Sequence, residues 1–223
     1  MSHGTSIQMI QIINNLFLHG EAGCCVYNRK YYPVHLRQGD LDGACAVYCV
    51  MMYLLILNIV TRRQLEDLYG KIRKKDSIKN LFKALFENKG LVRSGFYYTN
   101  LQSLINRHIG DLVKAKADNS EPESQTINRI KDSIERGEPI MISVQFSGGA
   151  HALLAIGYEA DEEGMFNIFC LDPGFDCPPT SYWNAVISLN KGSGNKYPHE
   201  WITYNQEYSK KIYLGETLII ERI

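Results

Sequence analysis

The sequence of 223 residues has no surplus of charge of either sign, because its 24 basic and 24 acidic side chains give a formal net charge of zero. A protein whose main partner is a nucleic acid needs a basic surplus or a basic stripe that neutralises phosphates. Here the basic residues are mixed with acids, as in residues 71–76 (KIRKKD). We therefore expect no nucleic-acid partner.

The sequence also lacks a hydrophobic run that is clearly long enough to cross a membrane. The longest apolar stretch, residues 44–60, is interrupted by Tyr48, Tyr53 and Asn58 and is marginal for the ~20 residues that a span needs. We interpret it as a buried helix. The first residues show no basic region followed by an apolar run and a small-residue cleavage site. We therefore expect a cytoplasmic protein, with signal-independent secretion as an effector left open.

The number and spacing of the cysteines exclude two kinds of site. Six cysteines in a chain of this length do not make a disulfide framework, and no pair has the two-residue spacing of zinc or redox motifs. We expect reduced thiols. Five of them are interpreted as core or loop residues, namely Cys24, Cys25, Cys49, Cys170 and Cys177. Two alternatives are a disulfide between Cys49 and Cys45 under oxidation and a redox latch formed by Cys170 and Cys177, which flank Asp172.

Hydrophobic residues make up 45% of the sequence, which is an ordinary value for a globular protein. This share of apolar residues excludes disorder of the whole chain. Residues 1–137 are predicted to be mainly helical, and residues 26–36 are expected to be extended. Thr61 and Gln64 have the spacing of a capping box. The polar residues 115–125 are expected to form a loop and the one plausible boundary. Helices are predicted over residues 7–17, from Cys45 along the apolar run, from Thr61 through Leu68, and over 77–88, 100–109 and 124–136.

Residues 138–223 are predicted to form a sheet. Residues 161–164 form a turn that predicts a hairpin between the second and third strands, and residues 191–198 read as an insertion rich in glycine and asparagine. Strands are expected at 140–146, 152–158, 165–171, 183–189 and 211–222. Helices followed by an antiparallel sheet indicate the α+β class. No internal repeat is present, and we expect residues 1–223 to form a single domain.

Cys45 stands directly before the apolar helix, after Gly43 and Ala44. Free amide N–H groups and the positive end of the helix dipole favour a thiolate at such a position, and the thiolate is the nucleophilic form of cysteine. Gln38 and the Cys45 N–H are candidates for binding an oxyanion. The alternative is that Cys45 is a small buried hydrophobic residue, as free cysteines usually are.

His151 opens a strand after Gly148 and Gly149, among apolar neighbours. Packing explains this position poorly, whereas a base for a thiol on a facing element would suit it. Asp172 ends the next strand of the hairpin, where it would orient the imidazole and support its charge. The alternatives are a structural histidine and a simple Asp-Pro-Gly turn.

The residues Gln38, Cys45, His151 and Asp172, in this order, resemble the papain-like cysteine peptidases. Gln38-Gly and Gly43-Ala-Cys45 are similar to the cluster that opens the central helix of that family, and residues 149–158 are similar to its histidine strand. The Asp-Pro after the following strand resembles the bacterial branch that includes the bacteriocin-processing, double-glycine peptidases. This resemblance implies a papain-like fold, with the nucleophile on a central helix of a helical lobe (1–137) and an antiparallel β lobe (138–223).

The resemblance further implies a bacterial cysteine peptidase that cleaves a protein or peptide substrate without a metal or organic cofactor. Cys45 would attack the carbonyl, His151 would act as base and acid, Asp172 would orient His151, and Gln38 would bind the oxyanion. Two positions depart from the family pattern. Gln38 lies seven residues before Cys45, one more than usual, which leaves His35 or Asp40 as alternatives, and Ala46 replaces an aromatic residue.

Three functions remain open from the sequence alone. The first is a cysteine hydrolase, as a peptidase. The second is a deamidase or an acyl or amide transferase, because these use the same triad of groups. The third is a binding module that has the fold without catalysis, since one scaffold hosts several chemistries. The oligomeric state is not encoded in any motif found here.

Overall fold

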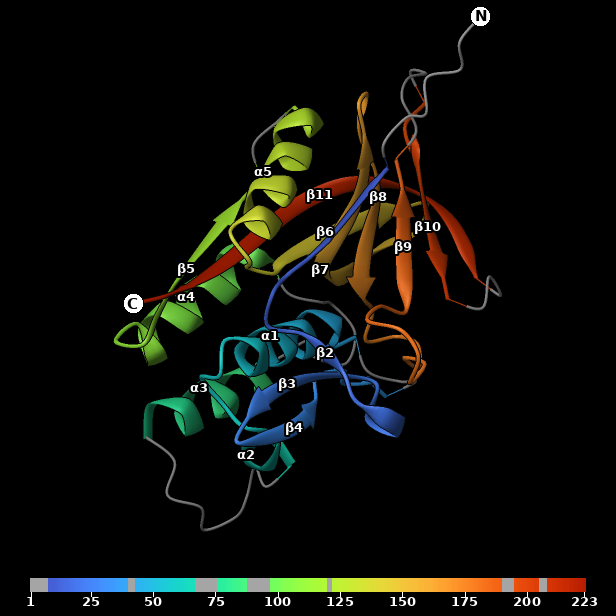
Figure 1. Ribbon diagram of the computed structural model, residues 1–223. Coiled ribbons are helices and arrows are strands. Elements are labelled where there is room, and N and C mark those ends of the chain that lie inside the picture. The colour runs from blue at the N-terminus through green and yellow to red at the C-terminus, as the bar shows by residue number, and fades with distance from the viewer. Residues whose placement is uncertain are drawn as a thin grey trace, which may run out of the picture.

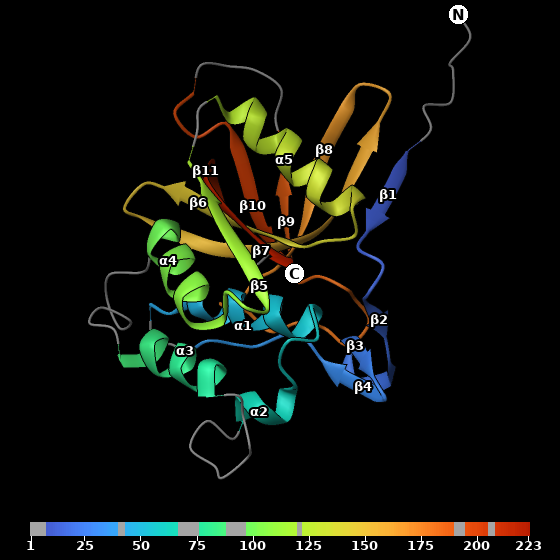
Figure 2. The same ribbon diagram turned by 90° about the vertical axis from the view of Figure 1, so that its left-hand side faces the viewer.

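The computed structural model describes residues 8–39, 43–66, 76–87, 97–119, 122–189, 195–204 and 208–223. Figures 1 and 2 show a twisted β-sheet unit on one side of the helix α1 (Cys45–Ile56) and a smaller group of helices and short strands on the other. α1 therefore lies in the middle of the molecule, between its two parts.

The largest unit is an eight-stranded antiparallel sheet. Its strands are β1 (Met9–Ile12), β5 (Val113–Asp118), β6 (Ile140–Phe146), β7 (Gly149–Asp161), β8 (Gly164–Leu171), β9 (Ala185–Ser188), β10 (His199–Thr203) and β11 (Ser209–Arg222). β7 pairs with β6 and β8, β11 pairs with β6 and β10, and β9 joins β8 to β10. Strands β6 to β11 thus close into a ring. β1 is added at β7 and β5 at β11.

The predicted hairpin is confirmed, because β7 and β8 pair through a turn in which Asp161 faces Gly164. The second, smaller sheet contains β2 (Phe17–Leu18), β3 (Cys24–Asn28) and β4 (Lys30–Pro33). It confirms most of the extended segment that was expected at residues 26–36.

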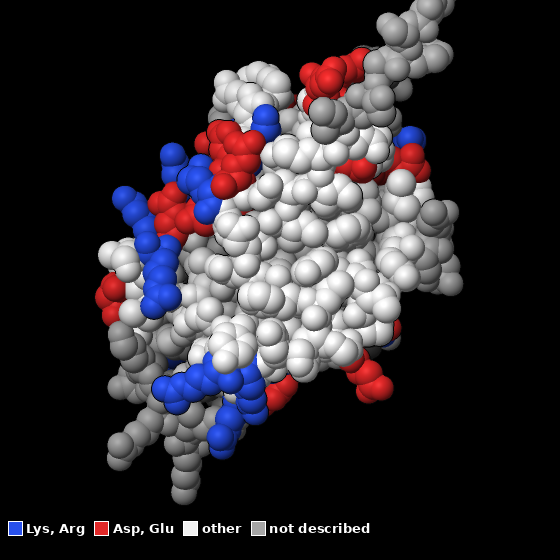
Figure 3. All heavy atoms as spheres, viewed as in Figure 1, with Lys and Arg blue, Asp and Glu red and all other residues white. Residues whose placement is uncertain are grey.

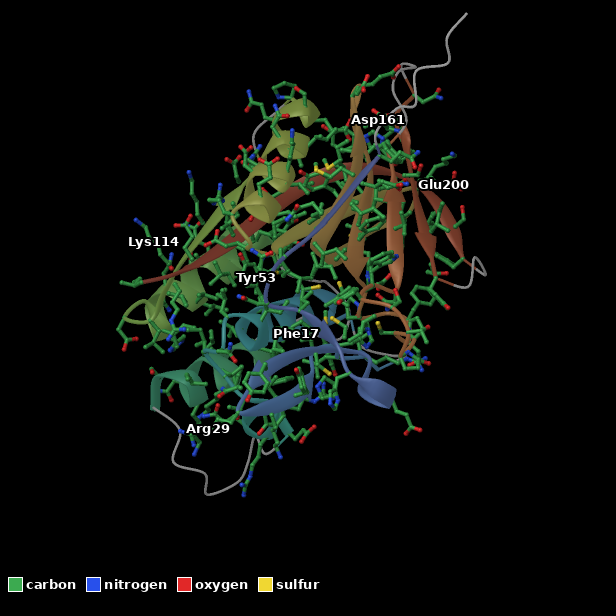
Figure 4. All side chains as sticks on the ribbon, viewed as in Figure 1. Phe17, Arg29, Tyr53, Lys114, Asp161 and Glu200 are labelled. Atoms are coloured by element: carbon green, nitrogen blue, oxygen red, sulfur yellow. The ribbon has the colours of Figure 1, made fainter. Side chains whose placement is uncertain are left out.

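α1 is buried on almost every side, as a helix without a polar face must be. This confirms the interpretation of the apolar run as a buried helix. α1 packs against β6 and β7. In Figure 4, Tyr53 lies in the centre of the molecule, where its hydroxyl accepts a hydrogen bond of 3.0 Å from the Ile220 amide of β11. This bond fixes the helix to a strand that is distant in sequence.

The other helices are α2 (Arg62–Glu66), α3 (Asp76–Glu87), α4 (Tyr98–Ile109) and α5 (Glu123–Glu135). The capping box is confirmed, because the Thr61 amide donates to Gln64 Oε1 at 2.8 Å and the Gln64 amide donates to Thr61 Oγ1 at 3.3 Å. Two predicted helix C-termini, at Leu68 and at residues 88–90, lie outside the described residues. α3 packs on α4, α4 on β5, and α5 on β11.

The helix predicted over residues 7–17 is wrong. Residues 9–12 form β1, which pairs with β7 from Met9 opposite Ala160 to Ile12 opposite Gly157. A Cβ atom on Gly157 would lie 2.6 Å from the Gln11 carbonyl oxygen, so glycine permits this close approach. The apolar spacing resembled that of a helix, but pairing with a distant strand decided the conformation.

The loop expected at residues 115–125 is also wrong in its first part. Val113–Asp118 is β5, in which buried Val113 and Ala115 alternate with exposed Lys114 and Lys116. This alternation is typical of a strand with one covered face. β10 was not predicted either. The division into a helical part (1–137) and a β part (138–223) stays an expectation, and β1 and β5 of the first part pair with the large sheet.

Charged side chains of both signs lie together along the edge formed by α5 and β5, as Figure 3 shows. There Arg129 pairs with Asp118 at 2.7 Å and Lys131 with Glu135 at 3.8 Å. The middle of the same face is uncharged. Within the described ranges, no helix is long and apolar enough to cross a membrane.

Candidate active site

A pocket of about 480 Å³ lies where the start of α1 meets β6, β7, β11 and the start of α4. Gln38, Cys45 and His151, three of the four candidate residues, line it. Asp172 is fully buried behind His151. The structure therefore brings together all four residues that the sequence singled out, from segments that lie up to 134 residues apart (172 − 38).

Cys45 is the first residue of α1, which has no side-chain cap at its N-terminus. Burial by itself raises the pKa of the Cys45 thiol. The hydrogen bond and positive charge of His151, with backbone hydrogen bonds at Ala152 and Ala46, outweigh burial and lower this pKa below its ordinary 9.0. The thiolate is therefore favoured at this position.

His151 lies on β7, and its Nε2 is 2.7 Å from Asp172 Oδ1. Its second nitrogen, Nδ1, is thus left for the hydrogen bond with Cys45. Burial disfavours the imidazolium, but the hydrogen bonds and negative charges of Asp172 and Cys45 outweigh burial and raise the pKa of His151 to about 10. Both shifts favour the charged forms, a thiolate on Cys45 and an imidazolium on His151.

Asp172 is held by backbone and amide groups that the sequence analysis did not identify. Its Oδ1 accepts the Gly174 amide at 2.8 Å. Asn184 is fully buried, accepts the Asp172 amide at 2.6 Å and donates to the Asp172 and Phe175 carbonyls at 2.8 Å each. Asn184 therefore fixes the backbone on both sides of the Asp172 side chain.

The segment before Cys45 is tied to the Asp172 loop. The backbone amide of Gln38 donates to the Pro173 carbonyl at 2.8 Å, and His35 Nε2 lies 2.9 Å from the Asp172 carbonyl oxygen. His35 thus contacts the Asp172 backbone, and Asp40 lies outside the described residues. The Gln38 Oε1 atom is buried and has no hydrogen-bond partner among the described residues. Gln38 lines the pocket and is therefore the candidate that stays in place for the oxyanion site.

Trp201 of β10 stacks on the His151 ring, with 4.9 Å between ring centroids and 17° between ring planes. It is 3% exposed and covers one face of the imidazole. An apolar cover of this kind keeps water from the hydrogen bond between His151 and Asp172. Neither β10 nor this contact was predicted, because nothing near Trp201 in sequence points to His151.

The other cysteines lie in the environments expected for core and loop residues. Cys24, Cys25, Cys49 and Cys170 are buried, and Cys177 is partly exposed. Burial raises the pKa of Cys177 to about 12, and burial also raises the pKa of Cys49 and Cys170. Within the described part of the chain, no group of three or more metal-binding side chains is arranged to hold an ion.

No family model matches the sequence, and no curated protein matches it either. Eighteen chains of solved structures match the fold. One is the crystal structure of UfSP from C. elegans, which is 14% identical and has a TM-score of 0.46. The match covers 99% of this chain and 36% of that chain, so the protein spans about a third of its length. The similarity is too distant to assign an activity.

Proposed function

We propose that this protein is a cysteine-dependent hydrolase of papain-like architecture that cleaves amide bonds in a protein or peptide substrate. The hydrogen bond of 2.7 Å between His151 Nε2 and Asp172 Oδ1, which leaves Nδ1 for Cys45, carries the proposal. The order Cys45, His151, Asp172 and the position of the thiol at the start of a buried helix support it.

In the proposed reaction, the Cys45 thiolate attacks the carbonyl carbon of the amide. The oxyanion that forms accepts hydrogen bonds from the Cys45 amide and the Gln38 side-chain amide. The imidazolium of His151 donates its Nδ1 proton to the leaving amine, the C–N bond breaks, and an acyl thioester of Cys45 remains. Asp172 keeps Nε2 protonated and the ring oriented throughout.

Water then releases the acyl group. Neutral His151 takes a proton from the water through Nδ1, and the resulting hydroxide attacks the thioester. The second tetrahedral intermediate collapses to a carboxylic acid and the Cys45 thiolate, while His151 keeps the proton. The thiolate–imidazolium pair of the resting enzyme is thereby restored.

The first test measures the rate of iodoacetamide labelling at Cys45 between pH 5 and 10 in the wild type and in His151→Ala. We expect fast labelling of the wild type well below the ~8.5 of a free thiol, and a loss of about 10²-fold at pH 6 in His151→Ala. Labelling that follows free-thiol pH dependence in both proteins would contradict the catalytic role and favour a binding module.

A second arm of the same test separates peptide cleavage from deamidation. Peptide libraries incubated with the protein are analysed by mass spectrometry together with an ammonia assay. New peptide termini support a peptidase. Ammonia release without new termini supports the deamidase, which uses the same thioester with ammonia as the leaving group. Cys45→Ala is the matched control for both products.

A further inference from the structure

Glu216 is a carboxylate in the Cys45 pocket that the proposed reaction does not use. It belongs to β11, whose pairing with β6 is interrupted between Leu214 and Thr217. Gly215 and Glu216 therefore form a β-bulge, and a bulge turns a side chain out of the regular alternation of a strand. Such bulges are common beside active sites.

Residues of β6 lie close to the bulge. A Cβ atom on Gly215 would lie 2.8 Å from Gln145 Nε2 and 3.2 Å from the Ser143 carbonyl oxygen, so only glycine fits there without a shift. Ser143 and Gln145 line the same pocket as Glu216. The backbone that presents Glu216 is thus packed against the pocket wall.

One of the two oxygens of Glu216 is already engaged. Oε2 accepts the Tyr98 amide at 3.0 Å, where α4 begins. This bond orients the carboxylate, and the positive end of α4 stabilises its charge. Oε1 has no hydrogen-bond partner among the described residues, so it can accept one from an occupant of the pocket.

Tyr98 and Glu216 are neighbours in the lining of the pocket. Tyr98 is 2% exposed and lines the pocket, and its hydroxyl has no hydrogen-bond partner among the described residues. Because this hydroxyl is itself buried, the partly exposed Glu216 carboxylate, rather than Tyr98, is the group that an occupant of the pocket can bind. Among the residues that line the pocket, Glu216 is the one carboxylate, and lysine and arginine do not occur.

We propose that Glu216 determines specificity and selects a lysine or arginine side chain of the substrate close to the amide bond that is cleaved. The proposal rests on the proposed function. A cationic side chain would form a charge-assisted hydrogen bond with Glu216 Oε1, whereas a neutral or acidic side chain would leave the carboxylate unpaired.

The test uses short peptides that end in an acyloxymethyl ketone, an electrophile that alkylates Cys45. At each of the three residues before the ketone in turn, the probe carries lysine, Nε-acetyllysine or glutamate, with glycine elsewhere. Acetyllysine has the reach of lysine without its charge. We expect the second-order rate constant with lysine to exceed that with acetyllysine about tenfold at one position.

In Glu216→Gln this ratio should fall to within about twofold, because the amide oxygen still accepts the Tyr98 amide while the charge is gone. Glu221→Gln, an exposed change on the same strand, is the matched control and should keep the wild-type ratio. If Glu216→Gln fails to fold, raising the salt concentration should lower the lysine rate of the wild type and leave the acetyllysine rate unchanged.

Two results overturn the inference: equal rates for lysine and acetyllysine in the wild type, or a lysine advantage that survives Glu216→Gln. Iodoacetamide labelling of the same samples distinguishes its failure from that of the proposed function. Fast labelling that depends on His151, without a lysine advantage, overturns the role of Glu216 alone. Slow labelling with no reaction of any probe overturns both.

Discussion

The first and second turns of α1 carry the same side chain in opposite environments. Cys45, in the first turn, faces the pocket and His151, and its pKa is lowered because hydrogen bonds and the positive charge of His151 outweigh burial. Cys49, in the second turn, is fully buried and donates to the Ala152 carbonyl at 3.4 Å. Burial raises the pKa of Cys49 well above 9.0.

The position of a cysteine along α1 therefore decides whether it is a candidate nucleophile or a packing residue. Both thiols approach the same part of β7, since Cys45 forms a hydrogen bond with the His151 side chain and Cys49 forms one with the carbonyl of the next residue, Ala152. Only the first turn has free amide groups and a base. Cys49 instead helps to hold α1 at a fixed distance from β7.

The largest expected effect comes from Asp172→Ala, which should reduce the difference in reactivity between Cys45 and Cys49 because it removes the group that supports His151. Without the hydrogen bond and charge of Asp172, the pKa of His151 should fall from about 10 towards its ordinary 6.5. Iodoacetamide labelling of Cys45 at pH 7 should then slow by about 10²-fold. Asp172→Asn keeps an acceptor and should lose less. An unchanged labelling rate in Asp172→Ala would contradict this role.

A smaller effect is expected in the pH dependence of stability. The pKa of His151 is higher in the folded than in the unfolded state, so its contribution is complete below 6.5 and is lost as the pH rises towards about 10. The pKa of Cys45 is lower in the folded state, so its contribution is complete above 9.0 and is lost as the pH falls. As the pH rises from 6.5 towards 9.0, the loss of the His151 contribution and the gain of the Cys45 contribution oppose each other.

The pair should therefore weaken the pH dependence of the free energy of unfolding between pH 6.5 and 9.0 and produce a decrease from 9.0 towards about 10. Each slope should be at most ~1.4 kcal/mol per pH unit. Urea unfolding of the wild type and of Cys45→Ala/His151→Ala measures it, and the difference between the two curves isolates the pair. A difference that does not vary from pH 5 to 10 would rule out the ion pair.

The smallest effect on reactivity is expected for Cys49→Ala, which tests whether the two cysteines of α1 have separate roles. Labelling of Cys45 should stay within about twofold of the wild type, because Cys49 contacts the β7 backbone rather than the base. The free energy of unfolding should fall by about 1–2 kcal/mol, since a small cavity replaces the sulfur. Intact-mass labelling and urea unfolding measure the two effects. A tenfold loss of labelling would mean that Cys49 takes part in the site.

Local patterns in the sequence were sufficient for some elements and not for others. The apolar run after Cys45 predicted α1, and the turn at residues 161–164 predicted the hairpin that places Asp172 near His151. The helix predicted over residues 7–17 failed because its apolar spacing suits either structure until β7 offers a partner. Alternation in β5 was detectable, but lysine in every second position resembled a polar loop.

The sequence by itself determined which groups are available and where α1 begins, because helix burial and hairpin pairing depend on neighbours along the chain. Only the tertiary structure decided how the site is completed. Asn184 beneath Asp172, Trp201 over His151 and Glu216 in its bulge come from separate strands and loops. Their contacts depend on how the strands close into a ring, and this non-local pairing leaves no periodic pattern in the sequence.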